Sequence, residues 1–159
     1  MVTRRDLVIV ALSLGVGATL GPVATAGSPP HVQESELFDW NALAVGPTEV
    51  GQYRKILRAK TATLDELEMH ATTLNPGQSS HPPHKHQNEE LVILASGKLE
   101  ATSNGKTRVL GPGSVIFNAS NQLHSVRNVG DVPAVYHVIN WTSPGMRETN
   151  APATPAKKP

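Results

Sequence analysis

Turn-forming sequences interrupt this chain so often that few architectures can accommodate it. Asn75-Pro76-Gly77, Asn104-Gly105 and Gly111-Pro112-Gly113 separate short apolar runs, and Asn-Gly is the strongest short signal for a β-hairpin. Short strands at such close spacing are typical of a β-sandwich or a small barrel. We therefore predict an all-β fold with strands at 51–59, 67–74, 90–96, 98–103, 107–110, 115–119, 124–129 and 134–141.

One helical element competes with these strands. Thr63 and Glu66 have the spacing of a capping box, so we expect a helical turn before the strand at 67–74. The composition agrees with a turn-rich β protein, since Gly and Pro number 13 each and only 17% of the residues are charged. A barrel of this size leaves a mouth wide enough for one small ligand.

The first 26 residues have the three parts of a secretory signal peptide. Arg4 and Arg5 form a basic start, an apolar run extends from Leu7 to Leu20, and Ala24-Thr25-Ala26 offers an A-x-A cleavage site. Spanning a bilayer takes roughly 20 apolar residues, and this run is shorter. We therefore expect cleavage and no stable membrane insertion, with an uncleaved membrane anchor as the lesser alternative.

The paired arginines also bear on the export route. Their place just before the apolar run resembles a twin-arginine signal, although the usual lysine after that motif is missing. The alternative is that they are ordinary charges of a secretory signal. Either way we predict a periplasmic or secreted protein, with a flexible leader at 27–35, one domain at 36–142 and a disordered Pro/Ala/Lys-rich tail at 143–159.

Charge and composition exclude some classes of function. Removing residues 1–26 takes away two basic and one acidic residue, which leaves 12 of each sign. A balanced chain offers no basic patch for nucleic acid, so we expect a small-molecule ligand or substrate. The chain has no cysteine, which excludes disulfides and thiolate metal sites.

Two histidines stand one residue apart beside two adjacent acids. Side chains alternate between the faces of a strand, so an unbroken strand from 84 to 94 would point His84, His86 and Glu90 inward. Lys85 and Glu89 would point outward. Burying a carboxylate without a partner costs several kcal/mol, and a divalent cation supplies that partner. His and Glu ligands without thiolate suit Mn, Fe, Co, Ni, Cu or Zn, and His124, which begins a later strand, is the candidate for a fourth ligand.

The order of these residues resembles the two sequence motifs of the cupin superfamily. The first motif is a glycine, H-x-H, three or four residues, Glu, six residues and Gly. The second is a glycine, a proline, a histidine, three residues and Asn. The first glycine of each motif lies one residue further away than usual. The matching residues are Gly77, His84, His86, Glu90 and Gly97 in the first motif, and Gly105, Pro112, His124 and Asn128 in the second.

This resemblance implies a small conical β-barrel, the double-stranded β-helix or jelly roll of the cupins, with a metal near its centre. His84, His86, Glu90 and His124 would bind the metal and leave one or two open positions, as a catalytic metal requires. Mn or Fe is favoured, because twin-arginine export carries folded cargo and a weakly bound metal can be loaded before Cu or Zn compete for the site.

The fold alone does not specify a reaction. Our first hypothesis is a metal-dependent, dioxygenase-like enzyme, which needs a redox metal and two adjacent open positions. The second is a non-catalytic binding or sensing protein, which needs a closed or absent metal site and a deep apolar pocket. The third is a non-redox isomerase or lyase, which needs an inward acid or base near the metal.

The remaining candidate residues have structural interpretations. We expect His81 in a loop near the barrel mouth, His70 half-buried and His137 on the surface, with the pocket as the alternative for His70 and His137. Asn128 is expected to brace the backbone. Phe117 and Trp141 are expected in the core. The segment 36–60 can supply an edge for a homodimer, and the sequence does not separate monomer from dimer.

Overall fold

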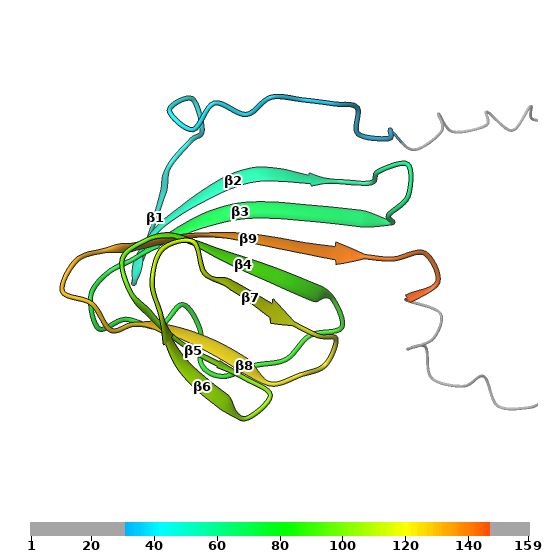
Figure 1. Cartoon of the computed structure of the whole chain (residues 1–159). Helices are drawn as coiled ribbons and strands as arrows, with labels where there is room; N and C mark the ends of the chain where they lie inside the picture. Colours follow the sequence, from blue (N-terminus) through cyan, green and yellow to red (C-terminus); the bar gives the residue numbers. More distant parts are fainter. Residues whose placement is uncertain (1–30, 147–159) are drawn as a thin grey trace, which may run out of the picture.

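The computed structural model describes residues 31–146, and the regular secondary structure of this part of the chain consists of β-strands (Figure 1). Antiparallel pairing produces a six-stranded sheet in the order β1-β2-β3-β9-β4-β7 and a three-stranded sheet in the order β6-β5-β8. The strands are β1 (Gly46–Thr48), β2 (Gly51–Ala59), β3 (Glu66–Leu74), β4 (Glu89–Ser96), β5 (Leu99–Ser103), β6 (Lys106–Leu110), β7 (Val115–Asn118), β8 (His124–Asn128) and β9 (Ala134–Thr142). The smaller sheet faces the larger one, so the predicted all-β fold is confirmed.

Each of the eight predicted strands is present with ends within one residue of those expected, and the three-residue β1 was not predicted. Asn104 and Gly105 have φ angles of 47° and 73°. Positive φ at both central residues is the backbone of a type I′ hairpin turn. The turn joins β5 to β6 with Ser103 opposite Lys106, as the Asn-Gly signal predicted.

The helical turn expected at Thr63–Glu66 is wrong. Thr61 closes this segment instead, because its Oγ1 accepts hydrogen bonds from the backbone N–H groups of Thr63 and Leu64 at 3.3 and 3.0 Å. The N–H of Thr61 in turn donates to the Leu64 carbonyl at 3.1 Å. These hydrogen bonds close a turn that is not helical, and β3 starts directly at Glu66.

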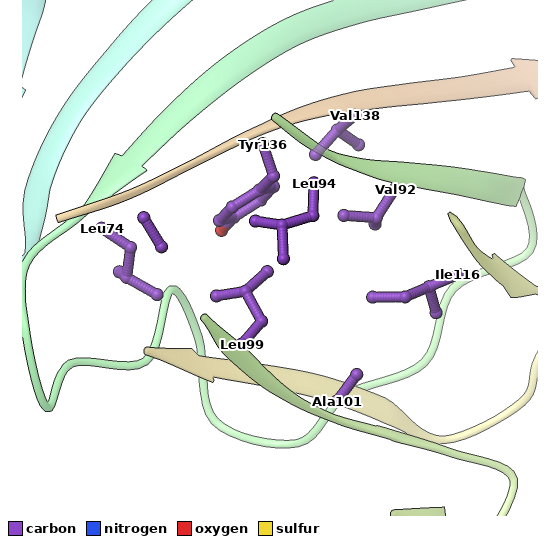
Figure 2. Close-up of a cluster of buried hydrophobic side chains, with 9 residues drawn as sticks. Leu74, Val92, Leu94, Leu99, Ala101, Ile116, Tyr136 and Val138 are labelled. Carbon is purple, nitrogen blue, oxygen red and sulfur yellow. The ribbon is translucent and has the colours of Figure 1, made fainter. Parts of the chain in front are cut away.

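Apolar side chains from both sheets fill the space between them (Figure 2). Leu94 of β4 and Leu99 of β5 point toward each other, with the Tyr136 ring of β9 beside them. Fully burying a leucine contributes about 1.5–3 kcal/mol, so this cluster holds the two sheets together. Its members are Leu74, Val92, Leu94, Leu99, Ala101, Ile116, Ala134, Tyr136 and Val138.

Alternation along β7 identifies the outer face of the larger sheet. Ile116 and Asn118 are buried, whereas Val115 and Phe117 are 58% and 52% exposed. The expectation that Phe117 lies in the core is therefore wrong, because its place in the strand turns it outward. Trp141 is only partly buried, and its register neighbours put it on the same outer face.

The segment before β1 lies along this outer face, where Figure 1 draws it in blue beside β2. The Trp40 ring meets the His137 ring edge to face at 5.7 Å between centroids, and the Arg54 guanidinium lies 4.5 Å from the centre of the Trp40 ring. His137 therefore lies outside the barrel, as the surface interpretation predicted.

The predicted signal peptide at 1–26 lies outside the described residues, as do parts of the predicted leader and tail, so the domain boundaries stay predictions. Within residues 31–146, no helix has the length and apolar character needed to cross a membrane.

Candidate metal centre

The chain changes sheets within the predicted histidine motif. His84 and His124 form an isolated bridge, in which each N–H donates to the other residue's carbonyl at 3.0 and 2.9 Å. His84 therefore adds to the edge of the smaller sheet beside β8. β4 begins only at Glu89, where it pairs with β9 of the larger sheet. The expectation of one unbroken strand from 84 to 94 is wrong.

Local hydrogen bonds fix this crossing. The Asn88 amide donates to the Trp141 carbonyl at 3.3 Å and to Thr142 Oγ1 at 2.7 Å, which anchors the start of β4 to the end of β9. The N–H of Asn121 donates to the His86 carbonyl at 2.8 Å. His86 thus lies in the segment that crosses from one sheet to the other. Its direction is set by this crossing and not by the alternation of side chains along one strand.

His84, His86 and His124 come together in space. One ring nitrogen from each histidine lies within 4.8 Å of those from the other two. The ring centroids of His84 and His86 lie 4.5 and 4.9 Å from that of His124. The proximity expected from the two motifs is therefore confirmed, and these three residues can hold a metal ion.

All three rings are oriented by a hydrogen bond between Nδ1 and a backbone carbonyl. Since a carbonyl only accepts, Nδ1 carries the hydrogen and Nε2 keeps its lone pair. Metal-binding histidines are oriented in the same way. The acceptors are Pro82 for His84 at 3.2 Å, Asn88 for His86 at 2.8 Å and Gln122 for His124 at 2.8 Å.

The fit to a metal rests on the Nε2 atom of His124. It is buried and has no hydrogen-bond partner among the described residues, a state that costs about 1–3 kcal/mol. Glu90 oxygens lie 3.7 Å from this atom and 3.6 Å from His86 Nε2, too far for hydrogen bonds. Two ligand atoms that each lie about 2.1 Å from one ion can be up to about 4.2 Å apart. The contacts of Glu90 with His86 and His124 are within this limit, and the three histidine nitrogens form the group that could hold a divalent cation.

Asn118 holds the Glu90 carboxylate in place. The two residues are register partners on β4 and β7, and the Asn118 amide donates to Glu90 Oε1 at 2.9 Å. Its own carbonyl oxygen accepts a hydrogen bond from Ser103 Oγ at 2.8 Å. The sequence analysis missed Asn118, although its alternation with Ile116 in β7 is the signal that marks it as inward.

The environment favours the neutral form of His84. Burial lowers the pKa of its imidazole below the ordinary value of 6.5, and the nearby His124 lowers it further. A metal binds the neutral imidazole. His84 therefore keeps its ligand form at lower pH than a free histidine does.

The three histidines and Glu90 open onto a cavity of about 220 Å³. Val92 and Val138 give it an apolar side, and Tyr136 lines it as well. The Tyr136 pKa is raised by burial, which keeps its hydroxyl protonated. The space suits a small molecule and is too small for a drug-sized ligand.

A second buried carboxylate lies beside this cavity. Glu68 is 7% exposed and approaches His70 Nδ1 at 2.9 Å and the Asn140 amide at 3.0 Å. His70 and Asn140 line the cavity, so the pocket alternative for His70 is the observed one. The strand predicted at 67–74 already places Glu68, His70 and Thr72 on one face. The group was missed because the sequence does not say that this face is the inner one.

The other predicted positions are mostly as expected. His81 lines the cavity while exposed to solvent, with its ring centroid 5.3 Å from that of His84. Asn128 braces the backbone, since its amide donates to the carbonyls of Leu74 and Val132 at 2.8 Å each. Lys85 is exposed. Glu89 is partly buried at the register position opposite Trp141, on the outer face.

The comparisons with known proteins agree with this architecture. The Cupin_2 family model, described as a cupin domain, matches residues 70–140. This range contains all four predicted metal ligands together with Glu68's partners His70 and Asn140. No curated protein sequence matches the chain.

Several solved structures share the fold. An RmlC-like cupin from Shewanella frigidimarina is 11% identical with a TM-score of 0.58, covering 72% of this chain and 96% of its own. A predicted oxalate decarboxylase from Thermotoga maritima is 18% identical with a TM-score of 0.56, covering 67% and 99%. The polyketide cyclase RemF from Streptomyces resistomycificus is 17% identical with a TM-score of 0.54, covering 70% and 82%.

Identities this low establish the fold and carry no activity over to this chain. The family match spans both histidine-bearing segments, and the matching structures cover most of the region between residues 31 and 146. The sheet order and the histidine cluster agree with both findings. Together these observations show that the chain has a fold similar to that of the cupins.

Proposed function

We propose that this protein is a cupin that binds one divalent metal ion through the Nε2 atoms of His84, His86 and His124 and the carboxylate of Glu90, and that it is an enzyme acting on a small molecule in the adjoining cavity. The observation that carries the proposal is the buried Nε2 of His124, which has a free lone pair and no partner in the described structure. A bound metal would supply Lewis acidity, an activated water or an oxygen-binding position.

The second layer of contacts supports a metal more than a plain polar core. Every ring is already committed through Nδ1 to a carbonyl, so the Nε2 atoms have no other evident role. Glu90 is fixed by Asn118 on one oxygen, which leaves the carboxylate oriented toward His86 and His124. In a core built only for stability, a buried acceptor such as His124 Nε2 would normally have a donor.

Manganese or iron is our preferred metal, with Ni, Co, Zn and Cu as alternatives. Three nitrogens and one carboxylate suit all of these ions, so the preference comes from the export argument. We propose that residues 1–26 direct export, by the twin-arginine route, of a protein that has already folded around its metal. Outside the cytoplasm, Cu and Zn would bind to an empty site in preference to Mn or Fe, according to the Irving–Williams order.

The reaction has two candidate classes. A dioxygenase-like reaction is supported by the mixed nitrogen and carboxylate ligands, which suit a redox metal. A non-redox isomerase or lyase reaction is supported by a specific observation, the Glu68–His70 pair beside the same cavity, because that class needs an inward base. A purely binding protein is less well supported, since the cavity is small and has several polar residues in its lining.

Metal analysis of protein purified from its native compartment tests the proposal directly. We expect close to one Mn or Fe per chain, and His84→Ala should lose it while His137→Ala, on the outer face, should keep it. Oxygen uptake with a panel of small molecules then separates the two reaction classes. Full metal content in His84→Ala, or protein that carries no metal when taken from the cell, would contradict the assignment.

A further inference from the structure

Glu68 and His70 form a buried pair whose protonation can be deduced from its partners. The Glu68 carboxylate receives the Asn140 amide at 3.0 Å and lies 3.4 Å from the Tyr53 hydroxyl. Burial and then the nearby Glu68 raise the Tyr53 pKa, so this hydroxyl stays a donor. All contacts therefore suit an ionised carboxylate, which can only accept. His70 Nδ1, at 2.9 and 3.1 Å from its oxygens, must carry the hydrogen.

The other ring nitrogen of His70 is the free one. With its hydrogen on Nδ1, a neutral His70 has its lone pair on Nε2. The hydrogen bonds of the His70 ring within the described part of the chain are made by Nδ1, and the residue lines the cavity. A carboxylate on Nδ1 fixes the orientation of a histidine ring and stabilises the imidazolium that forms when Nε2 takes a proton.

The pair lies two strands away from Glu90 in the larger sheet, and both adjoin one cavity. Glu68, Asn140 and Glu90 are successive register partners across β3, β9 and β4. Two strand spacings separate the first from the last, about 10 Å between backbones. A small molecule in the cavity can therefore reach both sites at once. Among the described residues that line the cavity there is no Lys or Arg, so an anion formed on a substrate has no protein cation to neutralise it.

We propose that His70, positioned by Glu68, is the general base of this site, and that the substrate is a small carbonyl compound with an exchangeable C–H next to the carbonyl. This inference deepens the proposed function and rests on it. It favours the non-redox class of reaction, in which a proton is removed and returned without an external oxidant.

The step balances without any further reactant. His70 Nε2 takes the proton from the carbon beside the carbonyl, so a C–H bond breaks and an N–H bond forms. The electron pair of the C–H bond becomes the C=C bond of an enolate. Glu68 holds the positive imidazolium through Nδ1–H. Return of the proton from Nε2 to carbon regenerates neutral His70 and gives either the original compound or its isomer.

Nitrogen-15 NMR of histidine-labelled protein tests the pair without any activity measurement. At a pH where the ring is neutral, with and without Zn²⁺ as a diamagnetic probe, we expect His70 with its hydrogen on Nδ1. The Nδ1 proton should lie downfield in the wild type and move upfield in Glu68→Gln, where the acceptor is no longer charged. A His70 ring with its hydrogen on Nε2 in the wild type overturns the proposal.

Proton exchange with solvent tests the base itself. We would incubate Zn-loaded protein in D₂O with pyruvate or hydroxyacetone, one charged and one neutral carbonyl probe, and follow loss of the C–H signals. We expect exchange faster than with Zn²⁺ alone, and a decrease of about 100-fold or more in His70→Gln. The matched control is His137→Gln. His137 is next in β9 to Val138, the register partner of His70, but lies on the outer face, so this variant should exchange like the wild type.

The measurements distinguish failure of this inference from failure of the proposed function. If the wild type binds no metal, the proposed metal site is wrong. The NMR result still reports on the Glu68–His70 pair in that case. Normal metal content in His70→Gln with undiminished exchange contradicts the base while leaving the metal site intact. Absence of wild-type exchange with both probes also overturns the assignment of His70.

Discussion

Two carboxylates lie in one register row across the larger sheet, and they differ in how they meet their histidines. Each is held by an asparagine on a neighbouring strand, Glu90 by Asn118 at 2.9 Å and Glu68 by Asn140 at 3.0 Å. Glu68 then forms a direct hydrogen bond with His70 at 2.9 Å. The Glu90 oxygens stop 3.6 and 3.7 Å short of the nearest histidine nitrogens.

The difference separates a closed pair from an open site. At Glu68, the ring nitrogen that faces the carboxylate is Nδ1, which carries a hydrogen, so the contact is complete without any additional group. At Glu90, the facing atoms are Nε2 lone pairs, because Nδ1 is engaged elsewhere. Lone pairs and a carboxylate repel one another unless a cation lies between them. Equal residue types thus give a proton-holding pair in one place and a cation site in the other.

Removing one histidine of the open site should have the largest effect on metal binding. We expect His124→Ala to weaken metal affinity by more than about 100-fold. Loss of a residue that only hydrogen-bonds to a metal ligand already lowers metal affinity by about 10–100-fold. Glu68→Gln should retain wild-type affinity, because Glu68 belongs to the closed pair. Calorimetric titration with Mn²⁺ measures both, with thermal unfolding as the check that each variant is folded. Equal loss in the two variants would erase the distinction between the sites.

Metal addition should stabilise the fold through the open site alone. At a free metal concentration 100 times the dissociation constant, the free energy of unfolding should rise by about 2.7 kcal/mol. The gain should persist in Glu68→Gln and disappear in His124→Ala. Denaturant unfolding with metal and with a chelator measures it, and an unchanged midpoint in the wild type would argue against a folded-state metal site.

The two asparagines allow a finer test. Asn118→Ala leaves Glu90 without its donor, so metal affinity should fall by about 10–100-fold. Asn140→Ala removes the equivalent contact from Glu68 and should leave metal affinity unchanged. The pair is well matched, since both amides line the cavity and both donate to a carboxylate in the same row. A similar loss of affinity in Asn140→Ala would mean that the two sites are not independent.

Sequence patterns predicted much more of the open site than of the closed pair. The spacing of His84, His86 and Glu90 and the position of His124 were enough to expect their proximity, which the structure confirms, while their role as metal ligands stays a prediction. The reason given for that proximity was wrong. The chain leaves one sheet after His84 and enters the other at Glu89, and strand parity cannot describe such a crossing.

The closed pair escaped prediction for a physical reason. Glu68 and His70 are two residues apart, but their meaning depends on which face of β3 is inside, and that is decided by pairing with β9, more than sixty residues later. Asn118 and Asn140 become relevant only through partners 28 and 72 residues away in the chain. Turn signals such as Asn104-Gly105 are local, which explains why the strand ends were predicted closely.

The pH dependence of stability should also distinguish the open site from the closed pair, and this is the smallest of the expected effects. The His84 pKa is lowered in the folded protein, first by burial and then by His124. Below the unfolded value of 6.5 the metal-free unfolded chain therefore binds more protons than the folded chain, and the free energy of unfolding must decrease as pH falls. The decrease ends once the folded His84 has also become protonated.

Denaturant unfolding of metal-free protein between about pH 5 and pH 8 measures this dependence around the ordinary histidine pKa. His84→Gln should flatten the slope, because it removes the group that titrates differently in the two states. His137→Gln, on the outer face, should keep the wild-type slope. Identical slopes in wild type and His84→Gln would mean that folding does not lower the pKa of His84. It would also weaken the claim that their lone pairs are held together for a cation.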